Sequence, residues 1–333
     1  MEFTRSLALF SKLQNSLGIE KDFEDILAKC TKAKTKFSDP DFYPSIPSSN
    51  SDNIFLQGVE WEYIDEVYQN HDLFDQISPD QIGQGNLSDC YLIVALTYIS
   101  KFPNIVKTIF HPKSSLENGI VLVYFQVMGE SLPVIIDTRI PFKTENSKKK
   151  VKTKNPDQMP IFSYSRINGR SPAWFALIEK AYAKACGSFA AIEYGQAHIA
   201  LHNLVGWFGN SINNISEKND NDEIFYTLMD LNEQNAMLSC SINFDRLSSE
   251  FISPDKLQKQ TGLVTSHSYS ILDVKKSNQN IFIKLRNPWC KYEWQGDYSK
   301  SSNKWTPKLK QDLNYPSGTD DIDGSFWMQI SDF

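Results

Sequence analysis

The sequence predicts an α+β fold that has a helical N-terminal half and a β-rich C-terminal half. Residues 91–99, an apolar run without Gly or Pro, and residues 174–186 are typical of buried helices. After Gly195 the pattern changes, because residues 266–274 and 280–286 alternate and are rich in β-branched and aromatic side chains, as strands are. We therefore expect a domain boundary near Gly195.

The other elements follow from spacing and alternation. Residues 1–35 carry apolar side chains at near-helical intervals, namely Leu7, Phe10, Leu13 and Leu17, and residues 38–53 are rich in Pro and Ser, which predicts an extended linker. Further predicted elements are strands at 59–64, 120–128, 133–137 and 236–244, a hairpin turn at 129–131, and helices at 196–204 and 223–234. Three regions result: an N-terminal anchor helix and extended linker (1–54), a first subdomain (55–195) and a second subdomain (196–333).

The composition is that of a globular protein and excludes several classes. A length of 333 residues suggests about two domains. The sequence is 41% hydrophobic and 22% charged, and its net charge of -6 argues against general nucleic-acid binding. No apolar run approaches the ~18 residues of a transmembrane segment, and the apolar stretch 7–10 is too short for a signal peptide.

The cysteines fit neither a disulfide framework nor a zinc ribbon, because they are odd in number, far apart and without a C-x-x-C pair. A reducing, cytoplasmic setting is therefore expected, in which every thiol stays free. The cysteines are Cys30, Cys90, Cys186, Cys240 and Cys290.

Two further patterns favour ordinary structure over a binding site. The lysines between 143 and 154 are typical of a solvated loop, with a site for an acidic partner as the alternative. His198 and His202 lie four apart on a predicted helix and could share a metal ion. Ile199 stands where the glutamate of H-E-x-x-H would be, and no third ligand is near, so ordinary helix or core histidines are favoured.

Cys90 lies where a polar turn runs into the predicted helix 91–99. Unpaired N–H groups and the helix dipole at a helix start favour negative charge, which makes a thiol there a usable nucleophile. A buried structural cysteine is the alternative. Gln84, six residues earlier, could donate its amide to an oxyanion beside the N–H of Cys90, although a Gln in a turn means little by itself.

The last two predicted strands are expected to form a hairpin with Val274 opposite Ile281. This register places His267 opposite Pro288 and beside Asn287. An Asn carbonyl can accept the N–H of a histidine and fix its tautomer, which leaves the other ring nitrogen free to take a proton from a thiol. For His267 alone, the alternative is an ordinary core histidine whose hydrogen bonds are satisfied. For Asn287 alone, the alternative is a turn residue before Pro.

Cys–His–Asn is a known form of the nucleophile–base–orienter triad. Cys90, His267 and Asn287 are therefore the candidate catalytic residues. Trp289 could cover the His–Asn bond and keep water away from it.

These residues resemble the calpain protease core, a two-part form of the papain-like cysteine protease fold. The blocks that carry the resemblance are 84–92, 174–187, 267–270, 286–296 and, more weakly, 323–328. The resemblance implies Cys90 as nucleophile, His267 as general base and then acid, and Asn287 as orienting residue. It also implies Gln84 as oxyanion donor, and it places Gly85 and Trp289 at the cleft, where Trp289 shields the site.

The resemblance further implies that the Cys lies on one subdomain and the His and Asn on the other, which agrees with a boundary near Gly195. Calpains typically have Gly-Asp-Cys-Trp at the nucleophile and Gly after Asn-Pro-Trp. In this sequence Ser88, Tyr91 and Cys290 stand at the differing positions. None of these changes removes a catalytic atom.

Calcium is implied by the resemblance, with one site of carboxylates in each subdomain, but the ligand set is incomplete. Ca²⁺ needs 6–8 oxygens, several of them charged. Asp80, Glu293 and Asp323 are weak candidate ligands. Acids are absent at other expected positions, which hold Gln81, Pro172, Lys300 and Ser325. We expect weak or absent calcium dependence.

The expected function is that of a cytoplasmic cysteine endopeptidase that hydrolyses peptide bonds of protein substrates through a Cys90 thioester. One alternative is a catalytically silent calpain-like scaffold or regulatory binding module. Another is a transglutaminase or similar acyl transferase, which would more usually pair the His with an Asp. The partners expected besides substrates are regulatory domains or an inhibitor protein.

Overall fold

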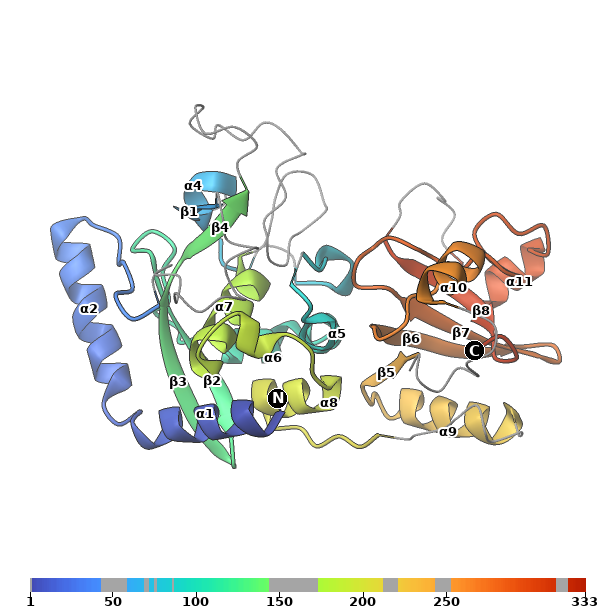
Figure 1. Cartoon of the computed structure of the whole chain (residues 1–333), viewed down its shortest axis with the longest axis horizontal. Coiled ribbons are helices and arrows are strands. Elements are labelled where there is room, and N and C mark those ends of the chain that lie inside the picture. The colour runs from blue at the N-terminus through green and yellow to red at the C-terminus, as the bar shows by residue number, and fades with distance from the viewer. Residues whose placement is uncertain are drawn as a thin grey trace. The chain divides into compact units, whose positions relative to one another are not determined.

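The computed structural model describes two compact units, Met1–Gly209 and Asn210–Phe333, each with its own sheets and apolar core (Figure 1). The cysteines are all free. Within the described residues, no helix combines the length and the apolar character that crossing a membrane would require. The predicted linker beyond residue 42, the lysine run beyond residue 143 and Pro172 lie outside the described residues, which are 2–42, 59–68, 72–74, 77–85, 87–143, 173–211, 221–242, 253–315 and 323–333.

The first unit contains helices around two small antiparallel sheets, β1–β4 and the β2–β3 hairpin. The predicted helix at 1–35 is two helices, which are separated at Gly18 because the chain takes a φ of 87° there. The elements are α1 (Glu2–Gln14), α2 (Ile19–Ala33), β1 (Val59–Tyr63), α4 (Ile64–Tyr68), η1 (Pro79–Gln81), α5 (Cys90–Ile99), α6 (Pro103–Thr108), β2 (Ile120–Val127), β3 (Glu130–Asp137), β4 (Arg139–Lys143), α7 (Trp174–Cys186), η2 (Ala190–Ile192) and α8 (Ala197–Val205).

The division between the units follows Gly209 and so lies beyond the predicted boundary at Gly195. Helix α8 lies between these two positions. It packs against α5 and β2 of the first unit, and Ala200, Leu201 and Leu204 are buried there. Because this apolar face is covered by the first unit, residues 196–209 belong to that unit.

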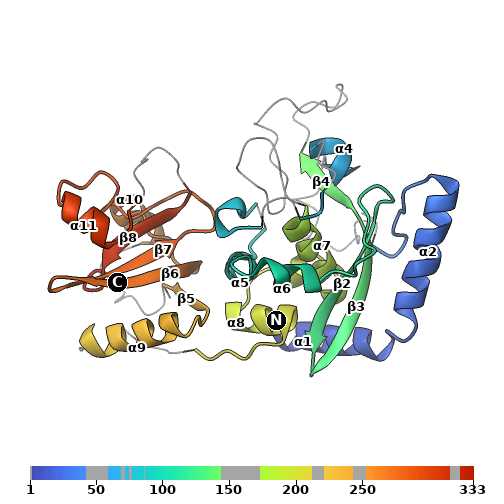
Figure 2. The same cartoon turned by 180° about the vertical axis from the view of Figure 1, so that it is seen from behind.

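Side-chain alternation along β2 explains the layers of the first unit. Ile120 and Leu122 face α2, where they form a cluster with Phe23. Phe125 faces the other way and lies against Tyr182 of α7, with ring centroids 5.4 Å apart. The hairpin thus lies between α2 and α7, as both views of the fold show (Figures 1 and 2).

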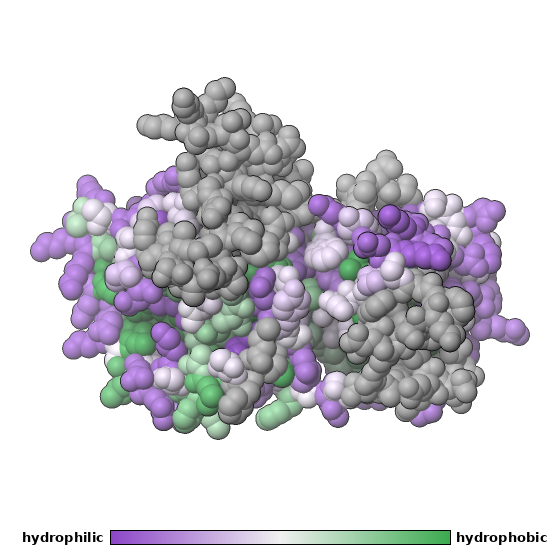
Figure 3. Space-filling model, viewed as in Figure 1, coloured by the Kyte–Doolittle hydropathy of each residue, from purple (hydrophilic) through white to green (hydrophobic). Residues whose placement is uncertain are grey.

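Helix α1 buries a different face from the one that its leucine spacing predicts. Leu9 and Arg5 are only 2% exposed, whereas Leu7 is 52% exposed and Leu17 is 99% exposed. Figure 3 shows apolar residues on the surface of the first unit in the region where α1 lies in Figure 1.

Helix α7 is buried along 12 of its 13 residues, including Lys180, which is 1% exposed. The ammonium of Lys180 forms an ion pair with Asp137 at the end of β3 and also donates to the carbonyl oxygen of Arg139 at 2.8 Å. Burial alone would raise the pKa of Asp137. The Lys180 charge and the hydrogen bonds from Arg139 and Lys180 outweigh it, so the pKa is lowered. This carboxylate therefore contributes stability above its ordinary pKa, and the contribution is lost as the pH falls through the lower folded value.

The second unit is a four-stranded antiparallel sheet in the order β5–β6–β7–β8. On β7, Ile281, Ile283 and Leu285 face the cluster that includes Phe225 of α9. Phe282 faces the opposite cluster near α11. The elements are α9 (Asn221–Glu233), β5 (Leu238–Ser241), α10 (Pro254–Thr261), β6 (Ser268–Ser277), β7 (Asn280–Arg286), α11 (Pro307–Asp312) and β8 (Ser325–Gln329).

The β6–β7 hairpin forms as predicted but in a different register. Strand β6 continues to Ser277, which pairs with Asn280, so the turn has two residues and Val274 lies opposite Ile283 instead of Ile281. Asn278 takes the left-handed conformation (φ 56°), which Asn tolerates well in a tight turn. A register shift between residues 271 and 273 then moves the far end of the hairpin by one position.

Replacing Asp137 by Asn should destabilise the chain strongly, because the buried ammonium of Lys180 loses its anion. We expect a loss of about 3–5 kcal/mol in the free energy of unfolding, measured by urea denaturation at neutral pH. The double variant Asp137→Asn with Lys180→Met should recover a large part of this loss. As a control, Lys113→Met removes the exposed ion pair with Glu24, and the urea midpoint should not move. A small effect of Asp137→Asn would contradict this account.

Candidate active site

Cys90 is the first residue of α5, as predicted. The nine residues that follow it in the helix are buried, whereas Cys90 is half-buried. The N–H groups of Leu92 and Ile93 both donate to the carbonyl oxygen of Asp89, at 2.8 and 3.2 Å. A buried apolar helix thus fixes the thiol at a helix N-terminus, where unpaired N–H groups favour negative charge.

Gln84 is buried, and its side-chain amide braces the turn before Cys90. The amide nitrogen donates to the carbonyl oxygen of Leu87 at 2.6 Å and makes a long contact of 3.5 Å with Asp89 Oδ1. Its amide oxygen has no partner among the described residues. Gly85 beside it is half-buried. The donor that the sequence assigns to an oxyanion is therefore engaged within the turn in this structure.

Arg5 of α1 supports the same turn from a distant part of the sequence. Its guanidinium donates to the carbonyl oxygens of Ala191 at 3.1 Å and Tyr194 at 2.9 Å. The N–H of Tyr194 in turn donates to the carbonyl oxygen of Ser88 at 2.8 Å. A Cβ at Gly195 would lie 2.8 Å from the guanidinium, so this approach requires glycine. Nothing in the sequence points to this role of Arg5, because it lies far from Cys90 along the chain.

Two buried carboxyl groups, Asp89 and Glu179, interact with each other, and Asp89 directly precedes Cys90. Asp89 is 0% exposed and Glu179, on α7, is 1% exposed. Burial raises the pKa of Asp89 well above its ordinary value, and the neighbouring Glu179 raises it further. Both effects favour the protonated form of Asp89. The sequence shows Glu179 as an acid on a helix face that is otherwise apolar, but it does not show that Asp89 is its partner.

His267 and Asn287 form the hydrogen bond that the hairpin argument predicts, with His267 Nε2 2.8 Å from Asn287 Oδ1. His267 is 3% exposed and Asn287 is 0% exposed. An amide oxygen only accepts hydrogen bonds, so Nε2 carries the proton and Nδ1 does not. The amide nitrogen of Asn287 donates to the carbonyl oxygens of Lys291 at 2.6 Å and Tyr292 at 3.2 Å, which fixes the orientation of the amide.

Trp289 lies against the His267 ring, with centroids 4.3 Å apart, and Tyr269 meets the same ring edge-on at 5.2 Å. The N–H of Trp289 also donates to Asn287 Oδ1 at 3.0 Å. Burial lowers the pKa of His267 to about 4, although the hydrogen bond with Asn287 opposes the shift. The ring is therefore a neutral base at physiological pH.

The residues proposed as calcium ligands do not fit a calcium site. Lys300 Nζ donates to Glu293 Oε1 at 2.8 Å and lies 3.7 Å from Asp323 Oδ1. A cation of the chain thus stands between the two carboxylates where Ca²⁺ would need both. Asp80 is exposed and accepts a hydrogen bond from Ser78 at 2.5 Å. In the part of the chain that the structure describes, no group of three or more His, Cys, Asp or Glu side chains could hold a metal ion.

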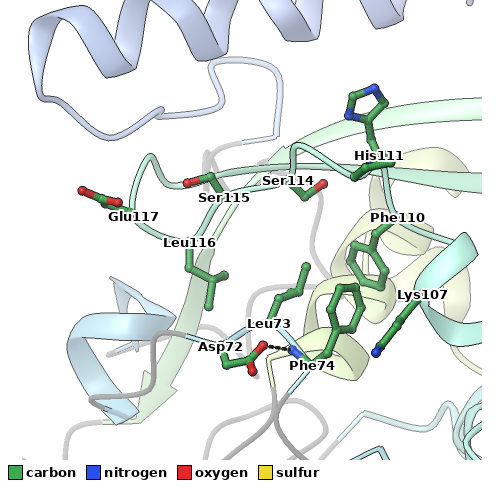
Figure 4. Close-up of a pocket in the computed structure, with 11 residues that line it drawn as sticks. Asp72, Leu73, Phe74, Lys107, Phe110, His111, Ser114, Ser115, Leu116 and Glu117 are labelled. Atoms are coloured by element: carbon green, nitrogen blue, oxygen red, sulfur yellow. Dashed lines mark hydrogen bonds between the residues drawn. The ribbon is translucent and has the colours of Figure 1, made fainter. Parts of the chain in front are cut away.

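A separate pocket of the first unit contains none of these residues. It is lined by Asp72, Leu73 and Phe74 and by side chains between 107 and 117 (Figure 4). Asp72 accepts the N–H of Phe74 at 2.9 Å, which holds one wall together. His198 and His202 also lie apart from the pocket, and His202 lies against Phe208 at 5.5 Å.

Comparison with known proteins gives one family. Residues 37–333 match the calpain family cysteine protease domain. Calpain-A of Drosophila melanogaster is 30% identical over 353 aligned residues, which cover 100% of this chain and 38% of that protein. Calpain-14 of Homo sapiens is 29% identical over 94% of this chain and 43% of that protein. The calpain-type cysteine protease DEK1 of Arabidopsis thaliana is 28% identical over 92% of this chain and 14% of that protein. The chain thus spans less than half the length of these relatives.

Replacing Glu179 by Gln should flatten the pH dependence of stability. In the natural chain the raised pKa of Asp89 gives stability at low pH that is lost as the pH rises through the folded value. An amide at 179 can donate to an ionised Asp89, so the variant no longer favours the protonated acid. We expect the stability of the variant relative to the natural chain to increase as the pH rises from 5.5 to 8.5, in urea denaturation. Glu117→Gln, at an exposed position, is the control; identical pH profiles for all three proteins would contradict this role of Glu179.

His267 should stay neutral well below pH 6, with the proton on Nε2. Because its folded pKa of about 4 lies below the ordinary value, the stability that it contributes is present above pH ~6.5 and is lost as the pH falls towards 4. Nitrogen NMR of the imidazole, assigned with a His267→Gln variant, reports both the tautomer and the titration. A midpoint near 6.5, or a proton on Nδ1, would overturn this assignment.

Proposed function

Since this chain belongs to the calpain family of cysteine proteases, we propose that it is a cytoplasmic cysteine endopeptidase with a papain-like two-subdomain core. Its substrates are proteins, which it cleaves by transfer of an acyl group to Cys90 and then to water. His267 acts as base and acid, and Asn287 orients it. Regulatory domains or an inhibitor protein are the further partners that we propose.

The hydrogen bond between His267 Nε2 and Asn287 Oδ1 carries this proposal. It leaves Nδ1 unprotonated, which is the state that a general base requires. Burial keeps the ring neutral until a thiolate lies beside it, and a thiolate would then stabilise the imidazolium form. The proposal requires that the two units bring Cys90 Sγ within hydrogen-bonding reach of this nitrogen when the enzyme acts.

In the reaction, the thiol proton of Cys90 moves to His267 Nδ1 and the sulfur attacks the peptide carbonyl carbon. The negative oxygen that forms accepts hydrogen bonds from the N–H of Cys90 and the amide of Gln84. For this role Gln84 gives up its long contact with Asp89. The imidazolium then protonates the leaving amine as the C–N bond breaks, which gives a thioester.

Hydrolysis of the thioester returns the enzyme to its starting state. His267 Nδ1 takes a proton from water, the hydroxide attacks the thioester carbonyl, and the C–S bond breaks. The sulfur leaves as a thiolate and recovers its proton from the imidazolium, while the product leaves as a carboxylic acid. Trp289, which lies against the ring, limits the access of water to the His–Asn bond.

The variant Cys90→Ala should lose casein cleavage by at least about 10³-fold while its circular dichroism spectrum stays unchanged. It should also lose labelling by a thiol-directed protease inhibitor. Cys240→Ala, which removes a half-buried thiol on β5 of the second unit, should keep both. The assay is run with a calcium chelator and with added Ca²⁺. Cleavage by Cys90→Ala would refute the nucleophile, and no cleavage by the natural chain in either condition would favour a catalytically silent scaffold.

A further inference from the structure

Lys300 lies between carboxylates that come from two separate segments of the second unit. Its ammonium donates to Glu293 Oε1 at 2.8 Å and is 3.7 Å from Asp323 Oδ1. The side chain of Glu293 is 13% exposed, that of Lys300 is 27% exposed and that of Asp323 is 39% exposed. The pair of Lys300 and Glu293 is thus partly shielded from water and is screened less than an ordinary surface ion pair, whereas the contact with Asp323 is more open to water.

Both segments that Lys300 joins also hold Asn287. The carbonyl oxygens of Lys291 and Tyr292, which directly precede Glu293, accept the two hydrogen bonds of the Asn287 amide nitrogen. On the other side, the N–H of Asn287 donates to the carbonyl oxygen of Gly324, next to Asp323, at 2.8 Å. A change in the spacing of the two segments would therefore turn the amide whose oxygen faces His267.

The segment after Asn287 needs an external restraint. Cys290 and Tyr292 have positive φ angles of 52° and 57°, which cost side-chain-bearing residues free energy. Gly324 also has a positive φ of 78°, and a Cβ there would lie 2.4 Å from the carbonyl oxygen of Asn287. The backbone around Asn287 is therefore close-packed and locally strained, and the contacts around it must hold it in place.

We propose that Lys300 is a positioning residue that performs, as a covalently attached cation, the task of a bound divalent cation. Its ammonium draws Glu293 and Asp323 together and so holds Asn287 in the orientation that fixes the His267 tautomer. An attached cation is present at a high effective concentration whatever the metal content of the solution. The second unit therefore needs no calcium to hold Asn287 and His267 in their catalytic orientation. The consequence for activity rests on the proposed protease function, whereas the consequence for the His–Asn bond does not.

The Asp323 side chain has a second partner that fits this account. Both of its oxygens accept hydrogen bonds from Ser325 Oγ, at 2.8 Å each. The carboxylate is thereby held at the start of β8 and faces the ammonium. The resemblance to calpains places acids at 300 and 325, and here a cation and a neutral donor at these positions complement the two carboxylates that are present.

The test compares Lys300→Met, Lys300→Arg and Lys300→Asp, with Lys304→Met as the matched control. Lys304 pairs with Asp297 in the same loop, but both side chains are about half-exposed. The readout that does not depend on activity is the imidazole NMR of His267 in a Cys90→Ala background. Lys300→Met should weaken or lose the Nε2–H signature of the bond to Asn287, Lys300→Arg should keep it, and Lys304→Met should leave it unchanged.

In the active chain, Lys300→Met should lower kcat for a peptide substrate by about 10- to 100-fold with little change in KM, because a small misplacement of a catalytic group is costly. Lys300→Arg should keep most of the kcat of the natural chain. Lys300→Asp should lose activity in a chelator and regain it, with the NMR signature, when millimolar Ca²⁺ is added. The natural chain should respond to neither chelator nor Ca²⁺.

An unchanged NMR signature in Lys300→Met would overturn the proposal, and so would a natural chain that needs Ca²⁺ to form the His–Asn bond. If every protein, the natural chain included, fails to cleave peptides while the NMR result holds, the protease function fails and the role of Lys300 in positioning Asn287 stands.

Discussion

A buried ammonium group needs an anion beside it, and the first unit is arranged around that requirement. Lys180 lies on a helix that is buried along nearly its whole length, and Asp137 at the end of β3 neutralises it. The same carboxylate accepts the backbone N–H of Asp39 at 2.8 Å, and Asp39 in turn pairs with Lys184, one turn further along α7, at 2.7 Å. The N-terminal segment, the hairpin and α7 are therefore locked in one arrangement, because breaking any of these pairs would strand a charge in the core.

Each candidate half of the site is prepared by buried polar groups of its own unit. In the first unit, burial and the neighbouring Glu179 favour the protonated form of Asp89, which directly precedes Cys90. In the second unit, the closed set of hydrogen bonds around Asn287 fixes one histidine tautomer. A buried polar network that is fully satisfied is rigid. The half that holds His267 and Asn287 therefore has its geometry before a substrate binds, which is what electrostatic preorganisation requires. In the first unit, the amide of Gln84 would have to leave a present contact to serve an oxyanion.

The cation between Glu293 and Asp323 extends the same principle to the loops of the second unit. Carboxylates from two segments repel each other unless a positive charge lies between them. A metal ion and a lysine both meet that need, but a lysine does so without depending on the solution. Glu293 and Asp323, which the resemblance assigns to calcium, therefore have a cationic partner within the chain. Asp80, the other candidate ligand, accepts a hydrogen bond from Ser78 and has no such cation beside it in the described residues.

The sequence by itself determined the elements and their local chemistry. Periodicity placed Cys90 at a helix start, and hairpin geometry brought His267 to Asn287 even though the strand register differed by two positions at the turn. These features depend on residues close in sequence, for which spacing is informative. Only the tertiary structure showed that Arg5 braces the turn before Cys90, that Glu179 meets Asp89, and that Lys300 lies between Glu293 and Asp323. Those partners are distant along the chain or lie on different loops. A charge pattern along one strand or helix does not show which distant residue will pair with a buried charge.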